Sequence, residues 1–503
     1  MIQGLRNRIR LVDLAALLLL VGPGIGGERS WAGDWTVRFG TGHAPLRALH
    51  GVNGGPLCYR GTVDLTAEHR ALGIPFTRLH DAPWVNAEAV DVHYIFRNPS
   101  ADPSDPANYD FRATDDYLEA VVRSGAQIVY RLGESIEHTA RQYWVHPPRD
   151  PEAWAAVCAG IVKHYNEGWA SGFRHGIRYW EIWNEPDVRP QMWTGTDEDY
   201  FRLYEVTAKT LKTRFPEIRV GGPAVGNIGD LVGNDLKPTP FVSAFLAYCR
   251  DRSVPLDFFS WHRYTADPGD IERRSRAVRR CLDDFGFVRT ESHLNEWNYL
   301  VNDDWTPLTP KGRGTERRRF FETLGGPEGA AFSISVLLRL QDAPLDMANY
   351  YTAEVQGFGL FDFHGAPKTT AAAFRLFREF LDTPQRGQET RVVESEVAHS
   401  GNTAAPSVCV IGAGRNAAGS RAAILVSASQ GLPSRVRVKL EDLPWPGSSR
   451  WKSKVVEGEG ARVREDSGTL RPEGILRLPA LKGPGVILMR LQPIESGDAD
   501  GAP

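Results

Sequence analysis

The chain has 503 residues and a formal net charge of −3, from 59 Lys and Arg against 62 Asp and Glu. This balance excludes a strongly basic nucleic-acid-binding protein, and a hydrophobic content of 42% excludes an intrinsically disordered chain. The five cysteines are scattered and show no C-x-x-C spacing, so the sequence predicts neither a disulfide scaffold nor a zinc site.

The N-terminus has the pattern of an export signal. Arginines at positions 6, 8 and 10 precede an apolar run over residues 11–21, and Ser30-Trp31-Ala32 resembles a cleavage site. The run is too short to span a bilayer, which takes about 20 apolar residues. Residues 1–32 are therefore predicted to be a cleaved signal peptide, so that the mature protein is secreted or periplasmic and keeps no stable membrane span. A poorly ordered arm or a retained anchor is the alternative.

Residues 33–44 contain a run with strand character, Asp34–Phe39, which we expect to pair with a C-terminal domain. Residues 45–382 alternate short apolar runs with longer amphipathic stretches. The stretches with helical spacing are Ala113–Ser124, Asp150–Glu167, Asp199–Phe215 and Phe241–Arg250. The runs typical of strands are Arg47–Val52, Phe76–His80, Gln127–Leu132, Tyr179–Trp183, Arg219–Pro223, Asp257–His262, His293–Glu296 and Leu345–Tyr350.

This alternation predicts an α/β fold, a (β/α)8 TIM barrel. A doubly wound sheet is the alternative, but no G-x-G-x-x-G follows a first strand. After residue 380 the pattern changes to short apolar runs separated by Gly, Pro, Ser and Asn, which predicts an accessory antiparallel β-sandwich over 383–494. Residues 495–503 are expected to be a disordered tail. We favour a bracing role for the sandwich over carbohydrate binding, because only Trp445 and Trp451 offer stacking rings there.

Two glutamates lie at strand ends, where a barrel carries its chemistry. Glu185 stands between Asn184 and Pro186, and the proline marks the end of a strand because it cannot donate a ladder hydrogen bond. Glu296 ends the seventh predicted strand, with Glu291 as a competitor earlier in that strand. Strands four and seven lie on nearly opposite sides of a barrel mouth, so the two carboxyls can face one substrate. Glycosidic bond cleavage needs such a pair.

Several segments resemble glycoside hydrolase family 39 of clan A, which includes β-xylosidases and α-L-iduronidases. Residues 180–187 (WEIWNEPD) resemble its acid/base motif, and Asn295-Glu296-Trp297-Asn298 resembles its nucleophile segment. Three further segments match in order: Gly51-Val52-Asn53, Arg78-Leu79-His80-Asp81 and residues 257–264 (DFFSWHRY). The resemblance covers residues 45–380, and the barrel-then-sandwich layout is similar too.

The resemblance implies a retaining mechanism, with Glu185 as acid/base, Glu296 as nucleophile and no metal or cofactor. It implies that Asn184 binds the sugar 2-hydroxyl and that Arg78 keeps Glu296 ionised. The other residues implied to contact substrate are His262, Tyr264, His80, Asp81, Asn53 and Trp297. The segment after the eighth strand is short here, which predicts a cleft open at one end. Trp193 and the Tyr143-Trp144 pair are either subsite walls or packing residues.

The sequence therefore predicts an exported retaining glycoside hydrolase that acts on a polysaccharide or oligosaccharide and is β-xylosidase-like or related. An endo-acting exopolysaccharide hydrolase of the same family is the alternative. A different class, a non-catalytic carbohydrate-binding barrel, is disfavoured because both glutamates are present. A metal-dependent hydrolase would use His80, Asp81 and His262. The expected partner is a carbohydrate and not a nucleic acid, and the oligomeric state is not predicted.

Overall fold

The computed structural model describes residues 34–40, 44–86, 88–389, 393–395, 407–433, 436–472 and 474–494. The predicted signal peptide and the predicted C-terminal tail lie outside these residues. Among the described helices, none combines the length and the apolar character needed to cross a membrane.

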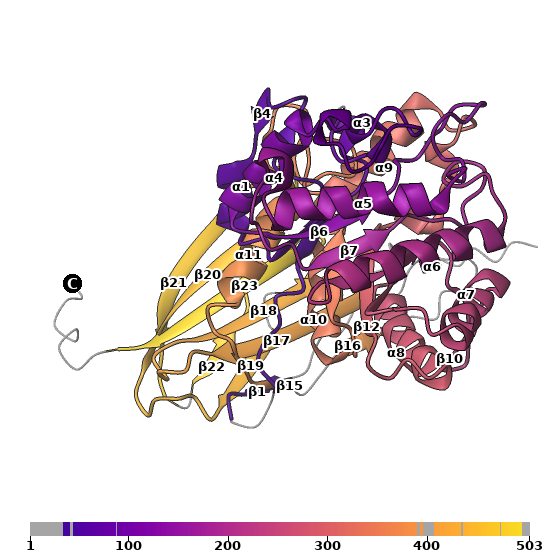
Figure 1. Ribbon diagram of the computed structural model, residues 1–503. Coiled ribbons are helices and arrows are strands. Elements are labelled where there is room, and N and C mark those ends of the chain that lie inside the picture. The colour runs from indigo at the N-terminus through magenta and orange to yellow at the C-terminus, as the bar shows by residue number, and fades with distance from the viewer. Residues whose placement is uncertain are drawn as a thin grey trace, which may run out of the picture.

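Eight parallel strands close into a barrel in the order β11-β12-β13-β2-β5-β6-β7-β8, of which Figure 1 labels β6, β7 and β12. The predicted (β/α)8 TIM barrel is thereby confirmed, and each strand overlaps a predicted run. The strands are β2 (Gly51–Asn53), β5 (Phe76–Leu79), β6 (Gln127–Leu132), β7 (Tyr179–Ile182), β8 (Arg219–Val225), β11 (Phe258–Thr265), β12 (Glu291–Tyr299) and β13 (Met347–Tyr350). Because all eight are parallel, their carboxyl ends meet at one mouth.

The outer ring consists of amphipathic helices whose ends follow the capping signals of the sequence. Asp150 accepts a hydrogen bond from the backbone N–H of Ala153, and Pro151 occupies the first turn of α5. Thr196 and Asp199 form a capping box, so α6 begins before the predicted Asp199. The larger helices are α1 (Thr66–Leu72), α4 (Arg112–Ser124), α5 (Pro151–Asn166), α6 (Asp197–Arg214), α7 (Pro240–Asp251), α8 (Pro268–Asp284), α9 (Gly314–Gly325), α10 (Pro327–Arg339) and α11 (Thr369–Phe380).

Several short helices and hairpins follow strands of the barrel. The helices α2 (Ala82–Val85) and α3 (Val92–Ile95) follow β5. Two hairpins are formed by β3 (Leu57–Cys58) with β4 (Val63–Asp64), and by β9 (Gly229–Val232) with β10 (Asp235–Pro238).

The C-terminal domain is a two-sheet sandwich. One sheet has the order β15-β1-β19-β22, and the other contains β14-β17-β18-β23-β20-β21 with β16 beside β17. Its strands are β1 (Asp34–Arg38), β14 (Gln385–Arg386), β15 (Gln388–Glu389), β16 (Val393–Ser395), β17 (Ser407–Arg415), β18 (Ala422–Ala428), β19 (Arg437–Glu441), β20 (Ser449–Glu457), β21 (Val463–Leu470), β22 (Ile475–Arg477) and β23 (Gly485–Pro493). One pairing departs from the predicted antiparallel pattern, because β1 runs parallel to β19.

The central strands β18 and β23 of the larger sheet are buried on both faces. Side chains such as Ile424 and Ile487 share a core with Trp35 and Val438 of the smaller sheet. On the other face, residues such as Leu425 belong to the barrel's core, where α10 and α11 contact β18 and β23. Burial on both faces explains why β18 and β23 read as continuous apolar runs instead of alternating ones.

Candidate active site

The structure brings Glu185 and Glu296 together at the barrel mouth. Glu185 follows the end of β7 and is held by a hydrogen bond of 3.0 Å from its backbone N–H to the carbonyl of Ala224. Glu296 lies within β12. One carboxyl oxygen from each and one ring nitrogen of His262 all lie within 4.8 Å of one another. Two carboxyls at this separation can act on the same bond.

A break in strand pairing allows Glu296 to face inward. The pairing of β11 with β12 shifts so that Asn295 is skipped, which is the pattern of a β-bulge. Asn295 hydrogen-bonds Glu181 inside the barrel, and the next residue, Glu296, contacts Arg78 there as well. Regular alternation would send one of these two neighbours outward. The bulge thus aims two consecutive side chains at one cavity.

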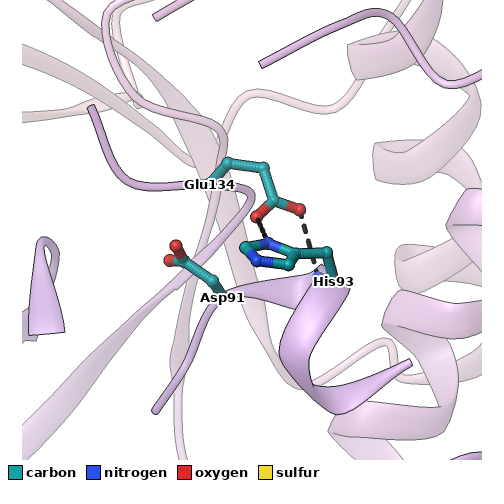
Figure 2. A group of neighbouring side chains, drawn as sticks. All are labelled: Asp91, His93 and Glu134. Atoms are coloured by element: carbon teal, nitrogen blue, oxygen red, sulfur yellow. Dashed lines mark hydrogen bonds and ion pairs between the residues drawn. The ribbon is translucent and has the colours of Figure 1, made fainter. Parts of the chain in front are cut away.

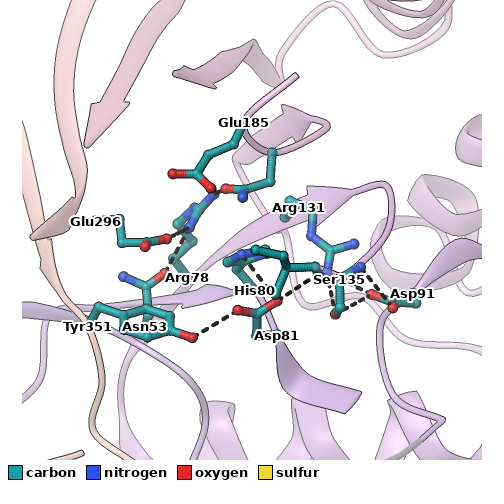
Figure 3. A network of polar contacts seen from close by, with 12 residues as sticks. Asn53, Arg78, His80, Asp81, Asp91, Arg131, Ser135, Glu185, Glu296 and Tyr351 are labelled. Carbon is teal, nitrogen blue, oxygen red and sulfur yellow. Dashed lines mark hydrogen bonds and ion pairs between the residues drawn. The ribbon is translucent and has the colours of Figure 1, made fainter. Parts of the chain in front are cut away.

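Arg78 connects the groups beneath the catalytic pair (Figure 3). Its Nε donates to Glu181 at 2.7 Å, and its Nη2 donates to the Oδ1 of Asn184 at 2.6 Å. Its Nη1 donates to Asn53 at 2.9 Å and to Glu296 at 3.3 Å. An arginine can only donate, so the amide oxygen of Asn184 must face it. The Nδ2 of Asn184 is then buried without a hydrogen-bond partner among the described residues, and can donate to a substrate hydroxyl.

Glu185 is placed in the environment of a general acid. Burial, followed by the charge of Asp81, raises the pKa of Glu185 to about 7, and Arg78 opposes the rise. The Nδ1 of His262 lies 2.8 Å from the Glu185 carboxyl. Burial lowers the pKa of His262 to about 4, so the imidazole is neutral near pH 7 and does not stabilise a Glu185 anion by its charge. Glu185 therefore holds its proton up to neutral pH.

Glu296 has partners that favour its ionised form. Tyr264 donates a hydrogen bond of 2.6 Å to one carboxyl oxygen, and Arg78 donates to the other. Burial and the charge of Glu185 raise the pKa of Glu296 above its ordinary value, and His262, the Arg78 charge and the Tyr264 hydrogen bond oppose the rise. Glu185 has no such direct arginine contact among its described ion pairs. The two carboxyls therefore differ in their surroundings, as an acid and a nucleophile must.

His80 and Asp81 form a second row beside the catalytic pair. The Nε2 of His80 lies 3.2 Å from Asp81, and burial holds the pKa of His80 well below its ordinary value. Asp81 accepts hydrogen bonds from the hydroxyl of Tyr351 at 2.8 Å and from the backbone N–H of Ile136 at 3.3 Å. Tyr351 belongs to the short segment after the eighth strand, and the sequence did not single it out.

Two tryptophans lie away from the position that the sequence indicated. Trp297 is fully buried and packs against Tyr350 and against Phe332 of α10, because the strand turns it outward immediately after Glu296. The prediction that Trp297 contacts the substrate is therefore wrong. Trp193 is also fully buried, and its indole N–H donates to the carbonyl of Thr196. It is a packing residue and not a subsite wall.

Glu291, the competitor for the nucleophile, begins β12 at the end of the barrel away from the mouth. Its carboxylate pairs with Arg219 at 3.1 Å and with His293 at 3.0 Å. A salt bridge at that end of a barrel stabilises the fold and does not take part in catalysis.

Two groups of described side chains have the composition of metal ligands. One is Glu185, His262 and Glu296, and the other is Asp91, His93 and Glu134 (Figure 2). Arg78 lies 3.3 Å from Glu296 in the first group, and Arg131 lies 2.6 Å from Asp91 in the second. Arg78 also pairs with Glu181, so each arginine offsets only part of the negative charge of its group.

We expect Glu181→Gln to lower the free energy of unfolding by about 3–5 kcal/mol, because a fully buried Arg78 loses its nearest carboxylate. Glu291→Gln is the matched control. Its ion pair is partly exposed, and we expect a loss below about 1 kcal/mol. Chemical denaturation of both variants measures the difference. Equal losses would show that Glu181 does not support the site through Arg78.

Comparison with known proteins supports the family resemblance found in the sequence. A model of glycosyl hydrolases family 39 matches residues 28–284. A β-xylosidase from Geobacillus stearothermophilus is 29% identical over 272 residues, which are 48% of this chain and 49% of that protein. A β-xylosidase from Caldicellulosiruptor saccharolyticus is 24% identical over 345 residues, which are 61% of this chain and 62% of that protein. The matches thus span about half to three fifths of these relatives.

Among solved structures, a glucosidase from Croceicoccus marinus has a TM-score of 0.73 and 25% identity, covering 92% of this chain and 99% of that one. Glu296 lies beyond the end of the family-model match. The family-model match by itself therefore does not cover the pairing of Glu296 with Glu185.

Proposed function

The chain belongs to glycosyl hydrolase family 39, and from this premise we propose that it is a retaining, β-xylosidase-like glycoside hydrolase. The observation that carries the proposal is the separation of the catalytic carboxyls, whose nearest oxygens lie within 4.8 Å. Retaining enzymes place the two carboxyl groups about 5–5.5 Å apart, and inverting enzymes place them about 6.5–9.5 Å apart to admit water. The shorter spacing supports attack by Glu296 itself.

In the first step, the ionised carboxylate of Glu296 attacks the anomeric carbon and forms an ester bond to the sugar. The bond from that carbon to the leaving oxygen breaks, and Glu185 donates its proton to this oxygen. Arg78 and Tyr264 hold Glu296 in place before the attack. The free amide N–H of Asn184 donates to the neighbouring sugar hydroxyl, and this bond strengthens as charge develops on the ring.

In the second step, Glu185 acts as a base. Esterification removes the negative charge of Glu296 and leaves Glu185 as the ionised carboxylate of the pair. Glu185 takes a proton from water, the water oxygen bonds to the anomeric carbon, and Glu296 leaves as a carboxylate. The configuration of the sugar is retained because two displacements occur.

We propose further that the enzyme acts outside the cytoplasm. The pattern of residues 1–32 supports this, with its basic start, apolar run and small-residue site.

A panel of 4-nitrophenyl glycosides tests the proposed function. We expect the β-D-xyloside to give the highest kcat/KM, above the β-D-glucoside and the α-L-arabinofuranoside, as measured by nitrophenol release. A preference for the glucoside would leave the proposed mechanism standing and would change the identity of the sugar that the enzyme prefers. Binding of xylo-oligosaccharides without hydrolysis of any glycoside would instead identify a non-catalytic carbohydrate-binding barrel.

A further inference from the structure

A hollow of about 320 Å³ adjoins the catalytic centre. The side chains that matter to the argument are Asp81, Trp84, Asp91, His93, Glu137 and Trp144, and we call this set the tryptophan hollow. None of these residues except Asp81 has a role in the reaction described above. Asp81 lines the hollow and also contacts residues beside the catalytic pair, so the two sites are adjacent.

Two indole rings of the tryptophan hollow are exposed. Trp84 is 54% exposed and Trp144 is 53% exposed, whereas Trp180 and Trp261 of the barrel are fully buried. Single exposed rings are ordinary, but exposed apolar side chains gathered in one hollow can mark a ligand-binding site. The flat apolar face of an indole stacks well on the C–H face of a sugar ring.

One face of the Trp144 ring packs against another side chain. Its ring stacks on that of His93 with centroids 4.1 Å apart and an interplanar angle of 7°. Figure 2 shows the His93 ring held by the carboxylate of Glu134, which also accepts the backbone N–H of His93 at 3.2 Å. The exposed face of Trp144 is therefore presented in one orientation, which reduces the entropy lost when a ligand binds.

The segment that carries Trp144 is anchored on both sides. The carboxylate of Glu137 accepts the backbone N–H groups of Tyr143 and Trp144, each at 2.6 Å. The backbone N–H of Thr194 donates to the carbonyl of Val145 at 3.0 Å. These hydrogen bonds fix the segment and so hold the exposed ring of Trp144 in place.

Contacts between side chains connect the tryptophan hollow to the nucleophile, and Figure 3 shows the part of this row that includes Tyr351, Asp81 and Asp91. Tyr264, which hydrogen-bonds Glu296, has its ring centroid 6.5 Å from that of Tyr351. Tyr351 donates to Asp81, which lines the hollow, and Figure 3 shows Asp91 and Arg131 beyond it. The row therefore places the hollow next to the catalytic centre, which is the arrangement that neighbouring units of one sugar chain require.

The polar groups of the hollow indicate the charge of its ligand. Asp81, Asp91 and Glu137 are all acidic, and Arg131 is already paired with Asp91 at 2.6 Å. Carboxylates accept hydrogen bonds from hydroxyl groups and repel another carboxylate. The hollow is suited to a neutral sugar and unsuited to a uronate.

We propose that the tryptophan hollow is a second sugar subsite, which binds a neutral unit of an oligosaccharide whose neighbouring unit lies at Glu185 and Glu296. The proposal rests on the proposed glycosidase function and adds to it a substrate of more than one sugar. The stacking rings are Trp84 and Trp144, and Asp81 lies where the two units meet. Binding energy from the hollow then holds the reacting unit in place.

The test uses the Glu296→Gln variant of the full chain, which we expect to bind substrate without turning it over. Titration calorimetry with β-1,4-xylotetraose is expected to show a Kd at least about tenfold higher when Trp144→Ala or Trp84→Ala is added, because a stacking ring is lost. Phe363→Ala, which removes a ring that is 68% exposed elsewhere on the surface, should leave the Kd unchanged. Thermal melting checks that each variant is folded.

A second readout separates a subsite from a structural role. In the otherwise wild-type enzyme, each tryptophan variant should keep the inhibition constant of free D-xylose within about threefold, because this ligand is a single sugar without an aglycone. An unchanged Kd for xylotetraose, or an equal loss for both ligands, would overturn the inference and leave the proposed function standing. Tryptophan-dependent binding by a chain whose wild-type form hydrolyses no glycoside would overturn the proposed function instead.

Discussion

Glu296→Gln is expected to lower kcat/KM by on the order of 10⁴-fold on every glycoside, because it removes the group that forms the covalent bond. An amide of the same shape keeps the contact with Tyr264 but cannot attack the anomeric carbon. The loss should appear in kcat more than in KM, since the proposed sugar contact of Asn184 remains. Steady-state kinetics on the aryl glycosides measures it.

Glu291→Gln is the matched control, because Glu291 lies on the same strand but starts it at the far end of the barrel. It should retain wild-type kcat/KM. Glu296→Ala with added azide should regain turnover, because azide enters the vacated space and forms a glycosyl azide of inverted configuration. If Glu296→Gln retains more than about a tenth of the wild-type rate, a different group is the nucleophile.

Glu185→Gln is expected to give a loss that depends on the leaving group. Proton donation contributes about 10²–10⁴-fold, and a poor leaving group such as a sugar hydroxyl needs all of it. A dinitrophenyl group leaves as a stable anion and needs little protonation, so the first step with it should stay near the wild-type rate. Pre-steady-state release of dinitrophenol separates that step from the second, which Glu185 also assists. Equal losses for both leaving groups would contradict the acid role.

The pH dependence provides a separate check on Glu185. Since its pKa is raised to about 7, wild-type kcat/KM should fall as the pH rises above about 7 and the acid loses its proton. Glu185→Gln should lose this basic limb. A basic limb that persists in the variant would belong to another group.

The same shift predicts a change in stability. A raised pKa means that the folded protein binds the Glu185 proton more tightly than the unfolded chain does. Stability is therefore lost as the pH rises from the ordinary value of 4.5 to about 7. Glu185→Gln carries no such penalty, so its melting temperature should exceed that of wild type by more at pH 8 than at pH 5.

The barrel could be predicted from the sequence because its strands are short apolar runs at regular intervals. Gln127–Leu132 has the predicted bounds of β6, and Glu185 was identified from the local sequence alone, since a proline ends the strand beside it. These features depend on residues that are close together in the chain.

Features that depend on pairing between distant segments could not be predicted. The bulge at Asn295 is a property of two strands, and it decides that Glu296 points inward while Trp297 points outward. The support that Glu181 gives to Arg78 crosses the barrel from β7 to β5. The pairing of residues 34–38 with the C-terminal domain was expected, but its parallel direction and its partner β19 were not.

The central claim is that Glu185 and Glu296 act from one cavity on one glycosidic bond, with Glu296 forming the covalent link. Incubation with 2,4-dinitrophenyl 2-deoxy-2-fluoro-β-D-xyloside tests it most directly, because the fluorine slows the second step and allows the ester to accumulate. Peptide mass spectrometry is expected to find one sugar, attached to Glu296. A label on any other residue, or no label together with a product of inverted configuration, would contradict the claim.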